Sequence, residues 1–402
     1  MKVLIIHNFY QSKSPSGENQ LVLDEMKLLR SHNNIQVKEF FFQSDSFYSH
    51  SPIGKLKMLL NIPWNFGLNK KIKSTLREFK PDVIHIHNTF PFISPSIFYK
   101  LRKYPIIFTL HNYRIFCASG TPLRDNKICL ECFEKNSFLP SLKYGCYRNS
   151  KIQTLPVFLK IVLANFFKVW EKYVKTFFVF SSFQKQLLSN TFLTNPNIRF
   201  VKKSNFMEDS SDENIPLNQR EKRVVFIGRL SNEKGILQLL DAWDETKNDY
   251  MLSIIGDGPL LEQCAKRIKN DRVLLEGKKS KQEVMQYIKN SQLTIIPSIC
   301  IEGFPMLIAE SFSQGTPILA SNYGPLPEYI IEGKTGFLID PIDKKQFSKT
   351  IDSILNNKQI LETVSNNCKE YFLNHLTSRR NLEILISEYS RAVNKIQTLS
   401  KD

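Results

Sequence analysis

The chain alternates short apolar runs with segments of helical period. In the first half, runs rich in β-branched and aromatic residues occupy 3–6, 37–42, 83–87, 106–110 and 177–180. In the second half they recur at 224–228, 252–255, 273–276, 293–297, 317–320 and 337–339, most of them separated by helical segments such as 236–243 and 260–268. Alternating strands and helices predict a doubly wound parallel sheet. Because the pattern begins again, we expect an α/β fold with two such sheets.

The boundaries follow from polar stretches and from length. A chain of 402 residues is long for one hydrophobic core. Residues 208–223 are polar and predict a linker between a first domain at 1–207 and a second at 224–377. After the last apolar run only helical patterns remain, at 344–356, 359–374 and 378–398. The final segment, 378–402, has no strand of its own to cover, so we expect it to cross back to the first domain.

Charge is divided unevenly between the halves. The net charge is +17, and Lys plus Arg minus Asp plus Glu gives 30 − 11 = +19 for residues 1–204 and 25 − 27 = −2 for residues 205–402. The basic half suits an anionic partner such as nucleic acid or a membrane face, and a solubilising surface explains it equally well. Charge therefore selects a partner only together with other features.

The apolar stretches of the chain indicate neither a signal peptide nor a transmembrane helix. Residues 1–6 are too short for a signal peptide, and the apolar stretch 155–180 is interrupted by charged residues. We therefore expect a cytoplasmic chain without a transmembrane helix.

The second half carries a candidate phosphate site. Arg229 follows one apolar strand and Lys234 opens the next helix, at the carboxyl end of the sheet where ligands bind. Arginine offers a planar fork to phosphate oxygens and lysine a compact charge. Residues 297–310 run from a strand through a glycine-containing loop into a helix, whose first N–H groups favour an anion. In that segment Glu302 is placed to accept hydrogen bonds from sugar hydroxyls, and Glu310 from a ribose.

These motifs together resemble glycosyltransferase family 4. They are Gly228-Arg229-Leu230 with Lys234-Gly235, Gly256-Asp257-Gly258-Pro259, Glu302-Gly303-Phe304-Pro305 with Glu310, and Gly315-Thr316-Pro317. The resemblance implies a GT-B fold, two Rossmann-like domains facing across a cleft, with a nucleotide-diphosphate sugar held mainly by the second. It implies donor-binding roles for Gly17, Arg229, Lys234, Glu302, Gly303, Phe304, Met306, Leu307 and Glu310. Members usually carry Gly-Phe-Gly where this chain has Gly303-Phe304-Pro305, which leaves the donor's identity open.

The first half resembles the same family at two loops. Pro15-Ser16-Gly17-Glu18 is similar to the family's glycine-rich first loop, where Gly17 would let the backbone approach the diphosphate. Thr109-Leu110-His111 is similar to its Thr-x-His segment, so His111 is the candidate catalytic group of this half, beside Glu302 in the other. His85 and His87 are interpreted as sheet residues.

The resemblance also implies the reaction. Members of the family retain the anomeric configuration of the donor sugar, and the sequence offers no surely placed carboxylate to serve as a glycosyl nucleophile. A front-face transfer, with the leaving diphosphate assisting deprotonation of the acceptor, is the working mechanism. The sequence contains no Asp-x-Asp, so no catalytic divalent metal is expected. The implied acceptor is a glycan or lipid-linked glycan of a cell-surface polysaccharide such as lipopolysaccharide or capsule.

Four of the seven cysteines are close in sequence: Cys117, Cys129, Cys132 and Cys146. Their spacing fits a structural zinc site of four thiolates, and unligated thiols or a redox pair also fit. The insert 117–146 follows His111, so an architectural role beside the acceptor is expected.

Two other classes of protein fit the sequence less well than a glycosyltransferase. A degenerate, non-catalytic module could hold nucleic acid or a partner, but the joint presence of Arg229, Lys234, Glu302 and Glu310 argues against it, and no nucleic acid partner is expected. A nicotinamide dehydrogenase lacks its glycine fingerprint after residues 3–10. The segment 55–64, with Trp64 and the following Lys70, Lys71 and Lys73, predicts peripheral contact with an anionic membrane, although packing against the sheet explains its apolar residues as well.

Overall fold

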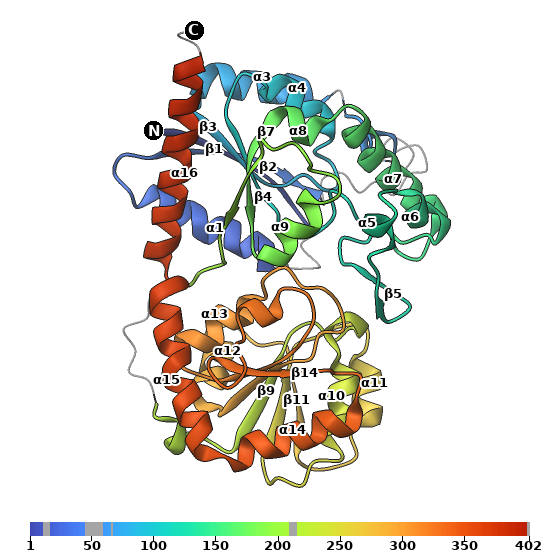
Figure 1. Cartoon of the computed structure of the whole chain (residues 1–402), viewed down its shortest axis with the longest axis vertical. Helices are drawn as coiled ribbons and strands as arrows, with labels where there is room; N and C mark the ends of the chain where they lie inside the picture. The colour runs from blue at the N-terminus through green and yellow to red at the C-terminus, as the bar shows by residue number, and fades with distance from the viewer. Residues whose placement is uncertain (11–16, 45–58, 66, 209–214, 400–402) are drawn as a thin grey trace. The chain divides into compact units, whose positions relative to one another are not determined.

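The computed structural model describes residues 1–10, 17–44, 59–65, 67–208 and 215–399. The described chain forms two compact units, drawn in Figure 1. Unit 1 comprises 1–122, 130–203 and 381–402, and unit 2 comprises 123–129 and 204–380. Each unit is built on a six-stranded parallel sheet. The predicted α/β fold of two doubly wound sheets is confirmed.

The sheet of unit 1 has the order β2-β1-β3-β4-β7-β8. Its strands are β1 (Lys2–Phe9), β2 (Gln36–Gln43), β3 (Val83–Asn88), β4 (Ile106–Thr109), β7 (Val174–Val179) and β8 (Arg199–Lys202). Five of them coincide with apolar runs of the sequence. The sixth, β8, was not predicted, because it is an edge strand with exposed Arg199 and Lys202 at its ends and only two apolar positions.

Helices cover both faces of this sheet (Figure 1). One face packs against α1 (Gly17–Arg30) and the last helix, α16 (Ser378–Leu399), through a buried cluster that joins Val22 and Met26 to Leu385 and Tyr389. The expected return of the last helix to the first sheet is therefore confirmed. On the other side lie α3 (Leu68–Phe79), α4 (Phe98–Leu101) and α8 (Val169–Tyr173), where Trp170 contacts Phe98 and Phe108. The remaining helices are α5 (Glu131–Glu134), α6 (Leu139–Lys143), α7 (Lys151–Phe166) and α9 (Ser182–Ser189).

The sheet of unit 2 has the order β11-β10-β9-β12-β13-β14. Its strands are β9 (Arg223–Ile227), β10 (Met251–Ile255), β11 (Val273–Gly277), β12 (Leu293–Ile296), β13 (Ile318–Ser321) and β14 (Gly336–Ile339), all at predicted positions. The order reverses between β9 and β12, and ligands of open α/β sheets bind at the carboxyl ends of the strands flanking such a point. The loops after β9 and β12 are therefore the expected place for a ligand.

The helices of unit 2 form two groups. Helix α10 (Ile236–Trp243) contacts α11 (Leu261–Arg267) and α14 (Lys344–Asn356), while α13 (Met306–Ser313) contacts α12 (Lys281–Asn290) and α15 (Lys358–His375). Figure 1 shows the two groups on opposite sides of the sheet. No helix in the described part of the chain is both long and apolar enough to cross a bilayer.

The predicted linker is more ordered than a polar stretch suggests. Residues 209–214 lie outside the described residues, but Leu217 and Arg220 are buried. The guanidinium of Arg220 donates to the carbonyl oxygens of Ser291 and Gln314 and to the Thr316 hydroxyl. Arg220 thus satisfies carbonyl groups of unit 2 from within the predicted linker.

Candidate functional site

Glycines bring the strand-end loops of unit 2 into backbone contact. Gly256, after β10, has φ +147°, and a Cβ built there would lie 1.8 Å from the Gly228 carbonyl oxygen. Gly235 has φ +68°, and a Cβ there would lie 1.8 Å from the Pro297 carbonyl oxygen after β12. Any side chain at these positions would force the loops apart. The glycines therefore hold the Arg229–Gly235 loop against the loops after β10 and β12.

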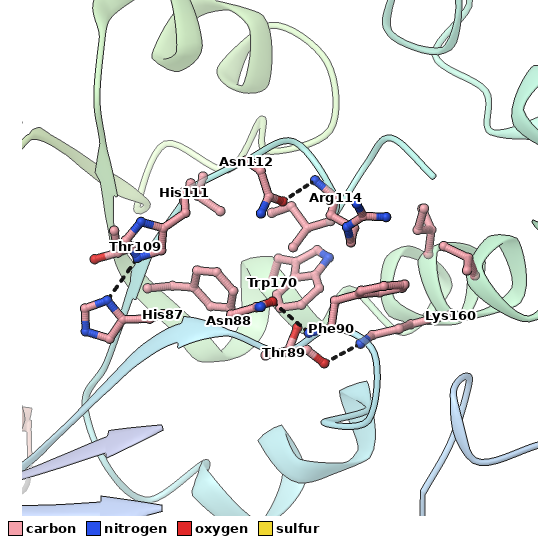
Figure 2. Close-up of a pocket in the computed structure, with 15 residues that line it drawn as sticks. His87, Asn88, Thr89, Phe90, Thr109, His111, Asn112, Arg114, Lys160 and Trp170 are labelled. Atoms are coloured by element: carbon pink, nitrogen blue, oxygen red, sulfur yellow. Dashed lines mark hydrogen bonds between the residues drawn. The ribbon is translucent and has the colours of Figure 1, made fainter. Parts of the chain in front are cut away.

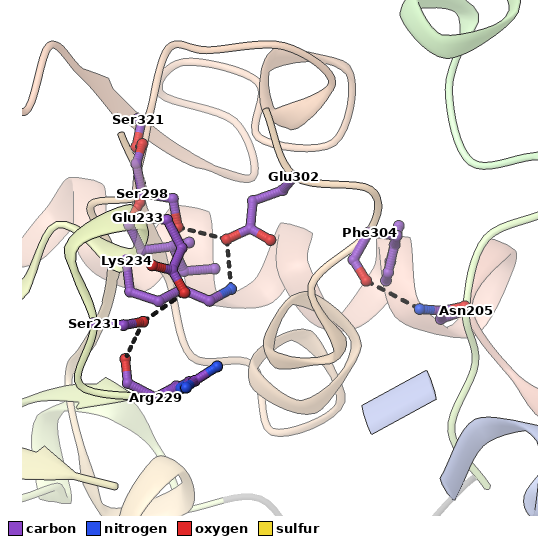
Figure 3. Close-up of polar contacts among 10 residues, drawn as sticks. Asn205, Arg229, Ser231, Glu233, Lys234, Ser298, Glu302, Phe304 and Ser321 are labelled. Carbon is purple, nitrogen blue, oxygen red and sulfur yellow. Dashed lines mark hydrogen bonds and ion pairs between the residues drawn. The ribbon is translucent and has the colours of Figure 1, made fainter. Parts of the chain in front are cut away.

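Lys234 and Glu302 meet across the point where the strand order reverses (Figure 3). The Lys234 Nζ donates to Glu302 Oε1 at 2.6 Å, and the Ser298 hydroxyl donates to the same oxygen at 2.6 Å. The Lys234 side chain remains 31% exposed and that of Glu302 13%. Burial would lower the pKa of the Lys234 ammonium, but the Glu302 carboxylate raises it, with a net increase. Lys234 therefore carries its charge at neutral pH, and Arg229 adds an exposed guanidinium from the same loop.

The segment between Glu302 and Glu310 forms the turn into α13. Helix α13 begins at Met306 after Pro305, which provides no side-chain cap. Phe304 is buried against Tyr329 at 4.7 Å between ring centroids, and its carbonyl oxygen accepts from Asn205 Nδ2 at 3.0 Å. Leu307 is buried, whereas Gly303 and Met306 are partly exposed. Phe304 and Leu307 therefore anchor this turn, and Gly303 and Met306 remain partly exposed beside them.

Glu310 lies in the second turn of α13 and is partly exposed. Burial raises the pKa of its carboxyl, and the nearby Lys281 opposes that shift. Its oxygens can accept hydrogen bonds from a ligand hydroxyl pair. The structure thus places Arg229, Lys234, Glu302 and Glu310 on the loops and helix that follow β9 and β12.

His111 of unit 1 follows β4 and contacts a histidine of β3 (Figure 2). His111 Nε2 lies 3.0 Å from His87 Nδ1, and the two rings stack at 5.3 Å. His87 Nε2 lies 3.2 Å from Glu25 Oε1 of α1, and Glu25 is 1% exposed. Burial and the neighbouring His85 lower the pKa of His87 to about 4, and burial with His87 holds that of His111 well below its usual value. Both imidazoles are therefore neutral at pH 7.

This contact chain assigns the tautomer of His111. The Glu25 Oε1 and His87 Nε2 atoms face each other, and neither has a hydrogen bond of good geometry with another described residue. A lone pair on Nε2 would repel the carboxylate in this buried setting, so the proton of His87 lies on Nε2. His87 Nδ1 then accepts, and His111 Nε2 must donate to it. His111 is left with Nδ1 as an acceptor.

Glu25 is also the centre of a buried ion pair. Its Oε2 accepts from Lys203 Nζ at 2.6 Å, and the Lys203 side chain is 0% exposed. His85 lies 3.3 Å from Glu25 Oε1 and bonds the Tyr389 hydroxyl and Thr109 Oγ1, each at 2.7 Å. Among the described residues, Glu25, His85 and His87 form the one group of ligand atoms close enough for a metal. The Lys203 ammonium already balances the charge of the Glu25 carboxylate, so the cluster is explained without a metal ion.

A second carboxylate lies near His111. Helix α1 begins at Gly17, while Pro15 and Ser16 of the predicted glycine-rich loop lie outside the described residues. Glu18 Oε2 accepts from Asn112 Nδ2 at 3.2 Å. Burial raises the pKa of the Glu18 carboxyl to about 8, against the opposing influence of Arg114 and Asn112. Gly17 and Glu18 are thus brought to the loop that carries His111.

The four cysteines of the insert are not assembled as ligands. All are partly exposed thiols outside any disulfide, and Cys117 Sγ lies 3.1 Å from the Ser119 hydroxyl. Among the described residues, the group of ligand atoms close enough to hold a metal does not include them. A short hairpin, β5 (Leu123–Arg124) and β6 (Lys127–Ile128), separates Cys117 from Cys129 and Cys132 along the chain. The four-thiolate zinc site therefore stays a prediction.

Metal analysis tests that prediction. If the thiols bind zinc, purified protein is expected to carry close to one zinc per chain and to lose it when Cys129 and Cys132 are both changed to Ser. Cys264→Ser, in unit 2, is the matched control and should leave the zinc content unchanged. Metal-free wild-type protein with unchanged stability would contradict the site.

The sequence patterns missed several of these residues. Glu25 occupies the core face of α1, whose buried positions are Leu21, Val22, Glu25, Met26 and Leu29. A charged residue in the phase of an apolar stripe signals a buried partner. The same signal marks Lys160 within the apolar face of α7. Lys203 and Ser298 carried no comparable signal, because each lies at the end of a strand.

The chain is similar to known proteins in two segments. Residues 207–371 match the family model of glycosyl transferases group 1, and residues 39–128 match that of glycosyltransferase family 4. A sulfoquinovosyl transferase of Arabidopsis thaliana is 22% identical over 92% of this chain and 68% of its own length. A lipopolysaccharide 1,6-galactosyltransferase of Salmonella typhimurium is 35% identical over 32% of this chain and 38% of its own. Three of the curated relatives are matched over 42%, 68% and 70% of their lengths.

The fold has solved counterparts. Anabaena HepE, in complex with UDP and glucose, has a TM-score of 0.63 and 17% identity over 97% of this chain and 100% of that one. The two parallel sheets, this likeness and the two family matches define a glycosyltransferase with the GT-B fold. Within this fold, the group 1 match lies in unit 2 and the family 4 match lies at 39–128.

Proposed function

We propose that this chain is a retaining glycosyltransferase. It transfers a sugar from a nucleotide-diphosphate donor to a glycan or lipid-linked glycan acceptor during synthesis of a cell-surface polysaccharide. The observation that carries the proposal is the Lys234–Glu302 pair, held by Ser298 where the sheet order of unit 2 reverses. The pair joins a cation suited to phosphate with a carboxylate suited to sugar hydroxyls.

The proposed chemistry follows from these charges. Lys234 and Arg229 would neutralise the negative charge that grows on the diphosphate as the glycosidic bond breaks. Accessible backbone N–H groups at the start of α13 would add to this, and the Glu310 carboxylate would accept from the ribose hydroxyls. A hydroxyl of the sugar would donate to Glu302. The acceptor would then attack on the face that the diphosphate leaves, with the diphosphate taking its proton, so that configuration is retained.

His111 has a separate role in this proposal. In the tautomer argued above from its contact with His87, its Nδ1 would be a hydrogen-bond acceptor. A neutral imidazole in this tautomer would accept a hydroxyl hydrogen of the donor sugar or the acceptor. No catalytic metal is required, because Lys234, Arg229 and the helix start supply the positive potential.

Different observations support the proposed acceptor and the proposed location of the enzyme in the cell. The similarity to a lipopolysaccharide galactosyltransferase and to HepE with UDP and glucose favours a UDP-sugar and a polysaccharide acceptor. The +19 charge of residues 1–204 favours an anionic surface beside that acceptor. We infer that the enzyme acts in the cytoplasm, as a peripheral protein of the inner membrane face.

A nucleotide screen tests the donor assignment. UDP, GDP, ADP and CMP are to be compared by thermal shift, and one diphosphate, expected to be UDP, should raise the melting temperature of unit 2. A ligand at a hundredfold excess over its Kd stabilises the folded form by about 2.7 kcal/mol. Transfer of labelled sugar from the matching donor to a lipid-linked glycan then distinguishes an enzyme from a binding module. No shift with any nucleotide would contradict the proposal, and binding without transfer or hydrolysis would indicate a degenerate module.

A further inference from the structure

Helix α7 exposes a continuous apolar face. Thr154, Val157, Ile161 and Ala164 are buried on its inner side. On the opposite side, Ile152 is 79% exposed, Leu155 44%, Leu159 38% and Phe166 77%. These four residues recur at intervals of three, four and seven, which places them in one stripe along the helix. A surface helix normally presents polar residues on this side, so these apolar side chains are unusually exposed among the described residues.

The apolar stripe continues beyond α7. At its carboxyl end the ring of Phe167 lies 5.5 Å from that of Trp64, and Trp64 lies 5.9 Å from Tyr99. Alongside, α6 contacts α7 and exposes Leu139 at 65%, and Tyr144 follows it at 43%. The segment 55–64 of the membrane prediction thus contributes Trp64 to this surface, whereas its Ile62 is buried and its residues 55–58 lie outside the described residues.

The surroundings of the stripe are cationic. Residues 139–175 contain seven Lys or Arg and one acidic residue, Glu171. Lys160 is buried, and the exposed cations are Lys143, Arg148, Lys151, Lys168, Lys172 and Lys175. An apolar stripe flanked by lysines and ended by Trp and Tyr matches the layers of a bilayer, with acyl chains beneath anionic headgroups. A nucleic acid would contact the lysines but leave the leucines exposed to water. A protein partner also fits less well, because the cores of protein interfaces are depleted in lysine.

We propose that the outer face of α7, with Trp64 at its end, is a docking surface for an anionic lipid bilayer. The helix lies in the plane of the interface rather than across it. Ile152, Leu155, Leu159 and Phe166 enter the boundary of the acyl chains, and the flanking lysines contact lipid phosphates. This surface is independent of the donor site, so its test uses binding without nucleotide or turnover.

Vesicle sedimentation tests the surface. The full chain is expected to bind vesicles containing phosphatidylglycerol, to bind neutral phosphatidylcholine vesicles much less, and to be released as salt rises. Ile152→Ser with Phe166→Ser should weaken binding at least tenfold. Leu274→Ser with Leu373→Ser removes two similarly exposed apolar residues from unit 2 and should leave binding unchanged. Lys168, Lys172 and Lys175 changed together to Gln should weaken binding and flatten its salt dependence.

Tryptophan fluorescence gives an independent signal. Of the three tryptophans, Trp170 and Trp243 are buried and Trp64 is partly exposed. Brominated phosphatidylglycerol should therefore quench the wild-type emission through Trp64, and Trp64→Phe should remove that quenching while the protein still sediments with vesicles. Three results would overturn the proposal: wild-type binding by the Ile152 and Phe166 variant, failure to bind either vesicle, or a wild-type dimer that this variant converts to a monomer.

Discussion

Replacing Lys234 with Ala is expected to reduce kcat/KM at least tenfold without unfolding the chain. The substitution removes the cation placed for the diphosphate. It leaves Glu302, whose side chain is 13% exposed, with a hydrogen bond from the Ser298 hydroxyl. A tenfold loss corresponds to about 1.4 kcal/mol of transition-state stabilisation. Glu310→Ala should lower kcat/KM by a similar factor, mainly through a higher KM. The reason is that Glu310 would contact the ribose both in the bound donor and in the transition state.

The controls for this prediction lie on α11. Lys266 and Glu262 are exposed there, so Lys266→Ala and Glu262→Ala remove the same charges away from the loops after β9 and β12. Turnover is measured with the donor that the nucleotide screen selects, and folding is checked by melting temperature. Wild-type turnover in both Lys234→Ala and Glu310→Ala would show that the donor binds elsewhere.

Replacing Glu25 with Gln is expected to destabilise unit 1 by about 3–5 kcal/mol, the cost of leaving one charge of a buried pair alone. The Lys203 ammonium, 0% exposed, would lose the carboxylate 2.6 Å away. Glu25→Met combined with Lys203→Met should cost much less, because neither charge then remains buried. Urea unfolding, followed by the fluorescence of the buried Trp170 of unit 1, measures both variants.

Two comparisons make the Glu25 prediction specific. Lys38 and Glu78 form an exposed pair at 3.3 Å, so Glu78→Gln should cost less than about 1 kcal/mol. Lys203 holds the pKa of the Glu25 carboxyl well below its usual range, although burial opposes this. The contribution of Glu25 is thus complete above the unfolded carboxyl pKa of about 4.3 and is lost as pH falls through the folded value. An equal loss of stability in the single and double variants would mean that packing, rather than charge, sets the cost.

The sequence predicted the fold well because its strands are buried on both faces. Such strands read as continuous apolar runs, and eleven of the twelve parallel strands were found this way. The failure at β8 has the opposite cause, since an edge strand buries little. Helix α14, residues 344–356, was predicted to the residue, because its apolar positions keep a helical period between two polar ends.

The sequence predicted only part of the candidate site. Arg229, Lys234, Glu302 and Glu310 follow recognisable strand and loop signals, and the structure places them on neighbouring elements. The contact of His87 with His111 could not be predicted from the sequence, because it depends on the order of the strands. Strands β3 and β4 are adjacent in the sheet, and this brings together two residues that are 24 positions apart. His87 was interpreted as a sheet residue, and it is one, but it also orients the candidate catalytic histidine.

The burial of Lys160 links α7 to the loop that follows β3 (Figure 2). From the inner side of the helix, its Nζ donates to the carbonyl oxygens of Thr89 at 2.6 Å and Ile93 at 2.9 Å. These hydrogen bonds tie the loop to the helix. A helix resting on lipid would hold this loop, and with it the carboxyl end of β3, at a fixed height above the headgroups. The enzyme would then select lipid-linked acceptors by length, favouring those whose reactive sugar lies at that height.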